Sequence, residues 1–159
     1  MSLSGVVKRW GERAHSGMIR PSPRRSDPMT APRDGRLRIS SGSSFEETIG
    51  FSRALRVGAR VLVSGTAPIW PDGSCDPSAE VQARRCLEII EDALVRSGAG
   101  LQHVVRTRMY LTRAEDAEAV GRAHGAAFGA ARPVATMVVV AALLDPRWRV
   151  EIEAEAMVD

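Results

Sequence analysis

Three glutamates near the end of the chain have the spacing that most directly suggests chemistry. Glu151, Glu153 and Glu155 alternate with the apolar residues of segment 150–156, which is the period-two pattern of a β-strand with one polar and one apolar face. A carboxylate held in a cleft can orient or deprotonate a water molecule. The same row is also typical of a solvated strand face, so the pattern alone leaves both interpretations open.

Other polar residues could complete such a site. Ser64 precedes Gly65 at the end of a short apolar run, where a serine is either a turn residue or a small polar group in a cleft. His124 lies on the apolar stripe of an expected helix, so we predict a hydrogen-bonded core histidine rather than a base. The arginines that could bring a cation to a cleft are Arg106, Arg108, Arg132, Arg147 and Arg149. No Ser-His-Asp arrangement, phosphate loop or metal-ligand spacing occurs.

Hydrophobic periodicity indicates the elements that must position these residues. Strands are expected at 37–40, at 52–57 and 60–64 around the Gly58-Ala59 turn, and at 104–111, 134–143 and 150–156. One helix is expected from an Asp76 cap to about Ser97, and a second after a capping box at 112–115. Residues 43–47 are expected to form a polar connection. The resulting β-β-β-α-β-α-β-β order predicts an α+β domain with two helices on one face of a mixed sheet.

Segment 134–143 is apolar at nearly every position, which is typical of a strand buried on both faces. Two helices can cover only one face of the sheet. We therefore expect the chain to associate with itself through the helix-free face, with a binding site between subunits.

Composition limits the class of protein. A chain of 159 residues suits one domain with a real core, and it has no apolar run long enough for a membrane helix, so a cytoplasmic protein is expected. Cys75 and Cys86 have no CxxC spacing, so free thiols are expected. Residues 1–36 hold eight basic and three acidic residues (+5), against fourteen basic and sixteen acidic in the rest (−2).

The basic segment 1–36 is also rich in Ser, Pro and Gly, a composition that predicts disorder, and residues 37–159 are predicted to form the folded domain. Three explanations of the segment stay open. The segment could serve as an arm that binds nucleic acid, as an organelle transit peptide, or as sequence upstream of a functional start at Met29. The absence of interleaved aromatic residues argues against the first.

Short matches in a fixed order cover about residues 45–158. They are Val63-Ser64-Gly65-Thr66, Gln82 with Leu87 and Ile90, Gly98-Ala99, Val104-Val105-Arg106-Thr107, segment 124–128, Arg132-Pro133, and Val150-Glu151-Ile152-Glu153-Ala154. Together they make the chain resemble the reactive-intermediate deaminase (RidA) family, also called the YjgF or L-PSP endoribonuclease-like family.

The resemblance implies a chorismate-mutase-like α+β fold and a homotrimer whose sheets form a central barrel, with small-molecule clefts at the subunit interfaces. In the deaminating members, such a cleft hydrolyses 2-imino or enamine acids to 2-keto acids and ammonia without a metal or organic cofactor. Carried over to this chain, the water-orienting glutamate matches Glu151 and the small polar residue before the glycine matches Ser64.

The chain departs from the family pattern at three further site positions. The arginine that holds the substrate carboxylate is replaced by Ala135, an aromatic hydroxyl by Phe51, and a frequent cysteine by Met137. Losing an Arg–carboxylate contact costs about 2–5 kcal/mol. We therefore expect altered or no deaminase activity and a less charged ligand.

Two alternatives stay open. The first is a deaminase that uses another arginine, with Arg108 as the candidate anchor. The second, ranked last, is an endoribonuclease linked to translation inhibition, because the folded part carries −2 and has no basic stripe with aromatic residues. The expected partners are therefore other copies of the chain and a small molecule, rather than nucleic acid or a membrane.

Overall fold

The computed structural model of the protein describes residues 35–159, so the prediction of disorder for the basic segment falls outside the described residues except at its last two positions. The described part forms six strands, three α-helices and two short 3-10 turns. Their bounds are β1 Arg36–Ile39, α2 Ser44–Ile49, β2 Ala54–Val57, β3 Arg60–Thr66, α3 Ala79–Arg96, a 3-10 turn Leu101–His103, β4 Val104–Leu111, a 3-10 turn Ala114–Asp116, α4 Ala117–Phe128, β5 Val134–Val139 and β6 Val150–Met157.

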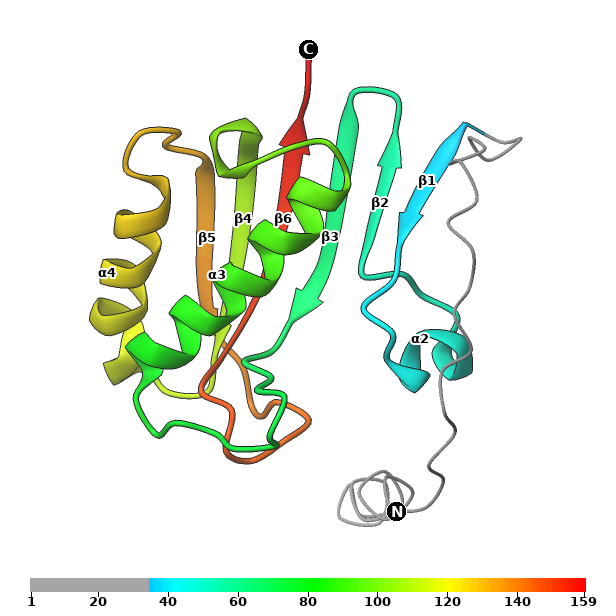
Figure 1. Ribbon diagram of the computed structural model, residues 1–159. Coiled ribbons are helices and arrows are strands. Elements are labelled where there is room, and N and C mark those ends of the chain that lie inside the picture. Colours follow the sequence, from blue (N-terminus) through cyan, green and yellow to red (C-terminus); the bar gives the residue numbers. More distant parts are fainter. Residues whose placement is uncertain (1–34) are drawn as a thin grey trace. The chain divides into compact units, whose positions relative to one another are not determined.

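The six strands form one mixed sheet in the order β1-β2-β3-β6-β4-β5. The last strand in the chain, β6, therefore lies in the middle of the sheet between β3 and β4 (Figure 1). Strands β4 and β5 are parallel, and every other pair is antiparallel. A turn at Gly58, whose φ is 58°, joins β2 to β3. The predicted α+β class and mixed sheet are confirmed.

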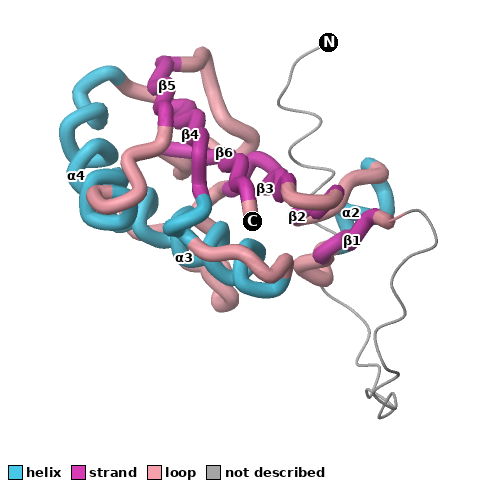
Figure 2. Tube along the Cα trace, turned by 90° about the horizontal axis from the view of Figure 1, so that it is seen from above, coloured by secondary structure: helices cyan, strands magenta, loops and turns pink. Residues whose placement is uncertain are grey.

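Helices α3 and α4 lie on one face of the sheet (Figures 1 and 2). The expected stripe of α3, formed by Ala83, Leu87, Ile90 and Leu94, is buried as predicted. It packs on the apolar side of β6, where the residues alternate strictly between buried and partly exposed. We call the opposite side of the sheet the open face. The three glutamates of β6 lie on it.

Strand β5 is an edge strand, and its apolar side chains are exposed in the single chain. Val134 is 63% exposed, Val139 is 55% exposed and Val138 is 42% exposed. The strand also ends at Val139 rather than at residue 143. Burial on both faces, expected from the sequence, is therefore not reached within one chain. Val134 and Val138 share the open face with the β6 glutamates, whereas α3 and α4 cover only the opposite face (Figure 2).

The structure corrects three local predictions. Residues 44–49, expected as a polar connection, form helix α2, with Ser43 as its N-cap. The N-cap of α3 is Ser78 rather than Asp76, whose carboxylate instead accepts a hydrogen bond from the Ser78 amide at 2.8 Å. The expected capping box at 112–115 is absent, because these residues lead into a 3-10 turn and α4 has no side-chain cap. The predicted caps of α3 and α4 are wrong because several polar residues near each helix start can compete for the cap position.

No helix in the described part of the chain is both long and apolar enough to cross a membrane.

Candidate functional site

A β-bulge in β3 shapes the backbone at the centre of the candidate site. The register between β3 and β6 shifts between Val63 and Thr66, so that Ser64 and Gly65 together oppose Glu153. Bulges of this kind locally free backbone groups from the strand ladder. Gly65 also lies against Glu151, the glutamate two positions before Glu153 on β6.

The carboxylate of Glu151 occupies the space that a side chain at Gly65 would need. A Cβ atom built at position 65 collides with Oε1 of Glu151. Burial raises the pKa of the Glu151 carboxyl; the charge of Arg53 opposes this effect and that of Glu153 adds to it. A half-buried carboxyl with a raised pKa is suited to exchanging a proton with a bound ligand or water.

Arg53, in the loop between α2 and β2, is the cation beside this bulge. Its Nη1 donates to the carbonyl oxygen of Gly65 at 3.1 Å, to that of Ser64 at 3.4 Å, and to Oγ1 of Thr66 at 2.6 Å. Burial lowers the pKa of the guanidinium, while the charges of Glu46 and Glu151 raise it. Arginine nevertheless stays protonated in proteins, so the group brings a permanent positive charge to the bulge.

Helix α2 positions the loop that carries Arg53. It ends at Gly50, whose φ is 82°, and the amides of Gly50 and Phe51 both donate to the carbonyl of Glu46, at 2.9 and 3.1 Å. The Glu46 side chain is buried and accepts from the amide and hydroxyl of Ser41 at 2.8 and 2.6 Å. This short helix, which the sequence analysis missed, therefore fixes the start of β2.

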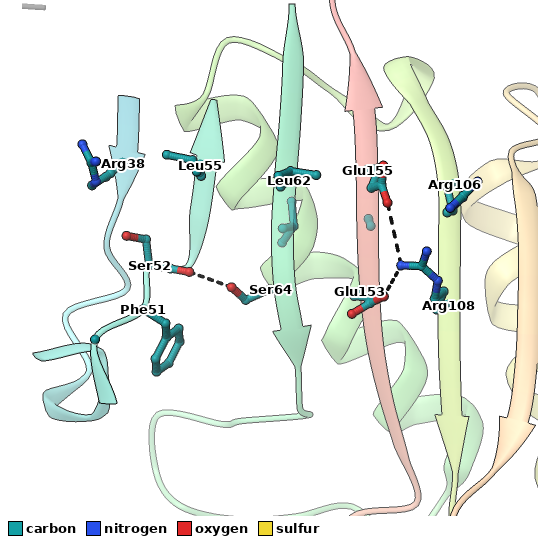
Figure 3. A pocket seen from close by; sticks show the side chains of 13 residues that line it. Arg38, Phe51, Ser52, Leu55, Leu62, Ser64, Arg106, Arg108, Glu153 and Glu155 are labelled. Carbon is teal, nitrogen blue, oxygen red and sulfur yellow. Dashed lines mark hydrogen bonds and ion pairs between the residues drawn. The ribbon is translucent and has the colours of Figure 1, made fainter. Parts of the chain in front are cut away.

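A cavity of about 460 Å³ lies on the open face of the sheet (Figure 3). Three of the predicted site residues, Phe51, Ser64 and Arg108, line it together with Arg106 and Glu153. The hydroxyl of Ser64 donates to the carbonyl of Ser52 at 2.7 Å, which is the backbone role of a serine at a strand end. Glu151 does not line this cavity.

Arg108 is occupied by neighbouring carboxylates. Its Nη1 forms an ion pair with Glu153 and lies 3.7 Å from Oε1 of Glu155 (Figure 3). Glu155 also binds Arg60 at 2.6 Å. A guanidinium that already faces two carboxylates offers less attraction to the carboxylate of a ligand.

Ala135 and Met137 lie on β5, away from Glu151. Ala135 pairs with Thr107 of β4, whereas Glu151 pairs with Tyr110 of the same strand. Directly paired residues share a face and successive residues alternate, so positions 135 and 151 lie on opposite faces of the sheet. Met137 packs against the core. One chain therefore does not bring these two positions together with Glu151.

The remaining candidates have structural partners. His124 lies 2.8 Å from Oγ1 of Thr107 through Nε2, which confirms the predicted hydrogen-bonded histidine. Arg147 pairs with Asp145, and Arg149 pairs with Asp116. Among residues 35–159, no group of three or more His, Cys, Asp or Glu side chains could hold a metal ion.

Arg53 is the residue that the sequence analysis missed. The only signal was an arginine two positions after Phe51, in a segment assigned to a strand. The bulge that gathers Arg53, Gly65 and Glu151 depends on the pairing of strands far apart in the chain, so spacing in the sequence could not reveal it.

Comparisons with known proteins identify the family of this chain. The profile of the family described as Endoribonuclease L-PSP matches residues 42–158. The uncharacterized protein SCO2049 of Streptomyces coelicolor is 40% identical over 122 residues, which is 75% of this chain and 90% of that protein. A RutC family protein of Pyrococcus abyssi is 31% identical over 95 residues, 58% of this chain and 75% of its own.

A solved structure gives the same result for the fold. The crystal structure of Rv2704 from Mycobacterium tuberculosis, described as a member of the YjgF/YER057c/UK114 family, has a TM-score of 0.72 and 46% sequence identity. The match covers 77% of this chain and 99% of Rv2704. The chain belongs to the L-PSP endoribonuclease family, also known as the YjgF or RidA family.

Proposed function

We propose that this protein binds a small metabolite beside Glu151, in a cleft between two copies of a homotrimer, and hydrolyses an imine or enamine bond with a specificity different from that of family members with an arginine at position 135. The observation that carries the proposal is the half-buried Glu151 carboxylate over Gly65, with its raised pKa. A group with these properties is able to move a proton during hydrolysis.

The chemistry requires few groups. A carboxylate oxygen of Glu151 accepts a proton as the water oxygen bonds to the imine carbon, and the proton is then delivered to the nitrogen. This first transfer gives a carbinolamine. Glu151 then moves the hydroxyl proton of the carbinolamine to the nitrogen, so the carbon–nitrogen bond breaks as the carbonyl forms and ammonia leaves. Water and imine thus give a keto compound and ammonia, with no oxidant and no cofactor.

The exposed edge of the sheet supports assembly. Val134, Val138 and Val139 leave an apolar surface on β5, and an unpaired edge strand tends to acquire a partner. The opposite faces of Ala135 and Glu151 also mean that a cleft containing both positions needs two chains. We therefore assign the cleft to the subunit interface.

The second candidate is binding without catalysis. It is favoured by the residue at position 135, since alanine cannot hold a carboxylate, and by Arg108, which faces Glu153 and Glu155. Cleavage of RNA ranks below both, and the absence of cleavage of single-stranded RNA in metal-free buffer would close it.

A 2-imino acid generated in place by an amino-acid oxidase provides the test. We expect the wild type to accelerate imine loss over buffer, and Glu151→Gln to lose about 100-fold or more of that acceleration. Glu91→Gln, on the exposed side of α3, is the matched control and should behave as wild type. No acceleration by the wild type would reject hydrolysis and leave binding as the function.

A further inference from the structure

We propose that Arg53 binds the carboxylate of the ligand beside Glu151, in place of the arginine that position 135 lacks. This inference rests on the proposed function only in taking the surroundings of Glu151 as the ligand site. It identifies the ligand as a small molecule that carries a carboxylate, and it holds whether or not the bound molecule is hydrolysed.

The guanidinium of Arg53 is held in position through one nitrogen. Nη1 makes three contacts with the bulge, to the carbonyl oxygens of Ser64 and Gly65 and to the hydroxyl of Thr66. Glu151 lies against Gly65, so the cation and the carboxylate approach the same two residues of β3. An arginine fixed in this way loses little side-chain freedom when it binds a ligand.

The second edge of the guanidinium is formed by Nε and Nη2. Within residues 35–159, no hydrogen bond or ion pair engages Nε or Nη2 of Arg53. These two nitrogens form the edge of a guanidinium that binds a carboxylate through two parallel hydrogen bonds. The side chain is also only partly buried, so a ligand can reach it.

The carboxylates near Arg53 form no ion pair with its guanidinium in the described part of the chain. Glu46 influences Arg53 through its charge, but its Oε1 accepts from the amide and hydroxyl of Ser41. Glu151 likewise influences Arg53 without a direct ion pair in the described chain. Arg108, by contrast, contacts Glu153 directly and also faces Glu155. Arg53 is therefore better placed than Arg108 to bind an additional carboxylate.

The test compares 2-oxobutanoate with 2-oxobutanamide, in which an uncharged amide of similar shape replaces the carboxylate, in titrations followed by ligand-observed NMR on the full chain. We expect the wild type to prefer the carboxylate by about 10- to 100-fold, the range for hydrogen bonds to a charged group. Arg53→Gln should remove this preference by weakening the binding of 2-oxobutanoate while leaving that of the amide unchanged. Arg53→Lys, which keeps the charge but not the two-nitrogen edge, should retain only part of it.

Two further variants separate Arg53 from its alternatives. Arg56→Gln on β2 should retain the preference and serves as the matched control, because Arg56 donates to the carbonyls of Gly58 and Ser97 and not to the bulge. Arg108→Gln tests the rival anchor and should also retain it. Thermal melting of each variant identifies any that fail to fold. If Arg53→Gln does not fold, Thr66→Val provides a second test. It keeps Arg53 but removes the hydroxyl that accepts from Nη1 at 2.6 Å, and it should reduce the preference for the carboxylate.

The outcomes distinguish this inference from the proposed function. A wild type without preference for the carboxylate, or a folded Arg53→Gln variant that keeps it, would overturn the anchor. Loss of the preference in Arg108→Gln alone would assign the anchor to Arg108. If the wild type fails to hydrolyse imines but its preference depends on Arg53, the anchor stands and hydrolysis is rejected. If hydrolysis proceeds and Arg53→Gln leaves KM unchanged, hydrolysis stands and the anchor is rejected.

Discussion

The carboxylate of Glu151 lies where the side chain of residue 65 would be, so Gly65 and Glu151 are sterically linked across β3 and β6. The backbone of Gly65 has no positive φ that would require glycine. The glycine is therefore explained by the neighbouring carboxylate rather than by backbone conformation.

Gly65→Ala should displace Glu151 without unfolding the protein. The colliding atom is the end of a flexible side chain, so we expect the free energy of unfolding to change by about 1 kcal/mol or less while imine hydrolysis falls at least about 10-fold. Chemical denaturation and the imine assay measure the two effects. Gly121→Ala in α4, where a Cβ meets no atom within 4 Å, is the control and should stabilise by about 0.5–1 kcal/mol. Unchanged hydrolysis in Gly65→Ala would argue against a role for Glu151.

The raised pKa of Glu151 predicts how stability depends on pH. A carboxyl with a higher pKa in the folded state contributes stability below its unfolded pKa, and this contribution is lost as the pH rises through the folded pKa. Glu151→Gln should therefore have a higher urea midpoint than the wild type at pH 8, and the difference should shrink towards pH 4.

Glu155 should show the opposite dependence. The hydrogen bond from Arg60 lowers the pKa of Glu155, so its contribution is present above its unfolded pKa and is lost as the pH falls. The urea midpoint of Glu155→Gln should therefore not exceed that of the wild type at pH 8. If Glu151→Gln and Glu155→Gln raise the urea midpoint equally at pH 8, general charge repulsion, and not the surroundings of Glu151, explains the stabilisation.

Thr107→Val should destabilise the protein by about 1–2 kcal/mol, because it removes the hydroxyl that lies 2.8 Å from Nε2 of His124. Thr107 is fully buried, so water cannot easily replace the lost partner. Urea unfolding above pH 7, where His124 is neutral because burial lowers its pKa, gives the measurement. Thr112→Val removes only a 3.4 Å contact to the carbonyl of Trp148 and should cost less than about 0.5 kcal/mol. Equal losses in the two variants would contradict the assignment of this histidine to the core.

Val134→Glu should disrupt self-association, because it places a charge on the exposed apolar edge at β5. Val95→Glu, on α3, is the matched control: Val95 is 62% exposed and Val134 is 63% exposed in the single chain. We expect Val134→Glu to weaken the assembly at least about 10-fold, as measured by light scattering after size-exclusion chromatography. A wild-type monomer would reject the trimer, and an intact assembly in Val134→Glu would exclude this part of β5 from the interface.

The amino-acid sequence by itself determined the class of the fold and most of its elements. The alternation of glutamates with apolar residues in β6, the stripe of α3 and the turn at Gly58 are local patterns, and each was confirmed. Such patterns are predictive because burial acts on each element with its own period. The order of short matches also identified the family, which the comparisons confirmed.

Only the tertiary structure decided which charged residues meet. The pairing of β3 with β6 joins residues about ninety positions apart, and its bulge places Arg53 and Glu151 at Gly65, while the register of β4 with β5 puts Ala135 on the opposite face. Arg108 was the predicted anchor because Arg106 and Arg108 share a strand face, yet Arg108 faces Glu153 and Glu155. The physical reason is that side-chain contacts across a sheet depend on strand order and register, and these are set by the packing of the whole domain.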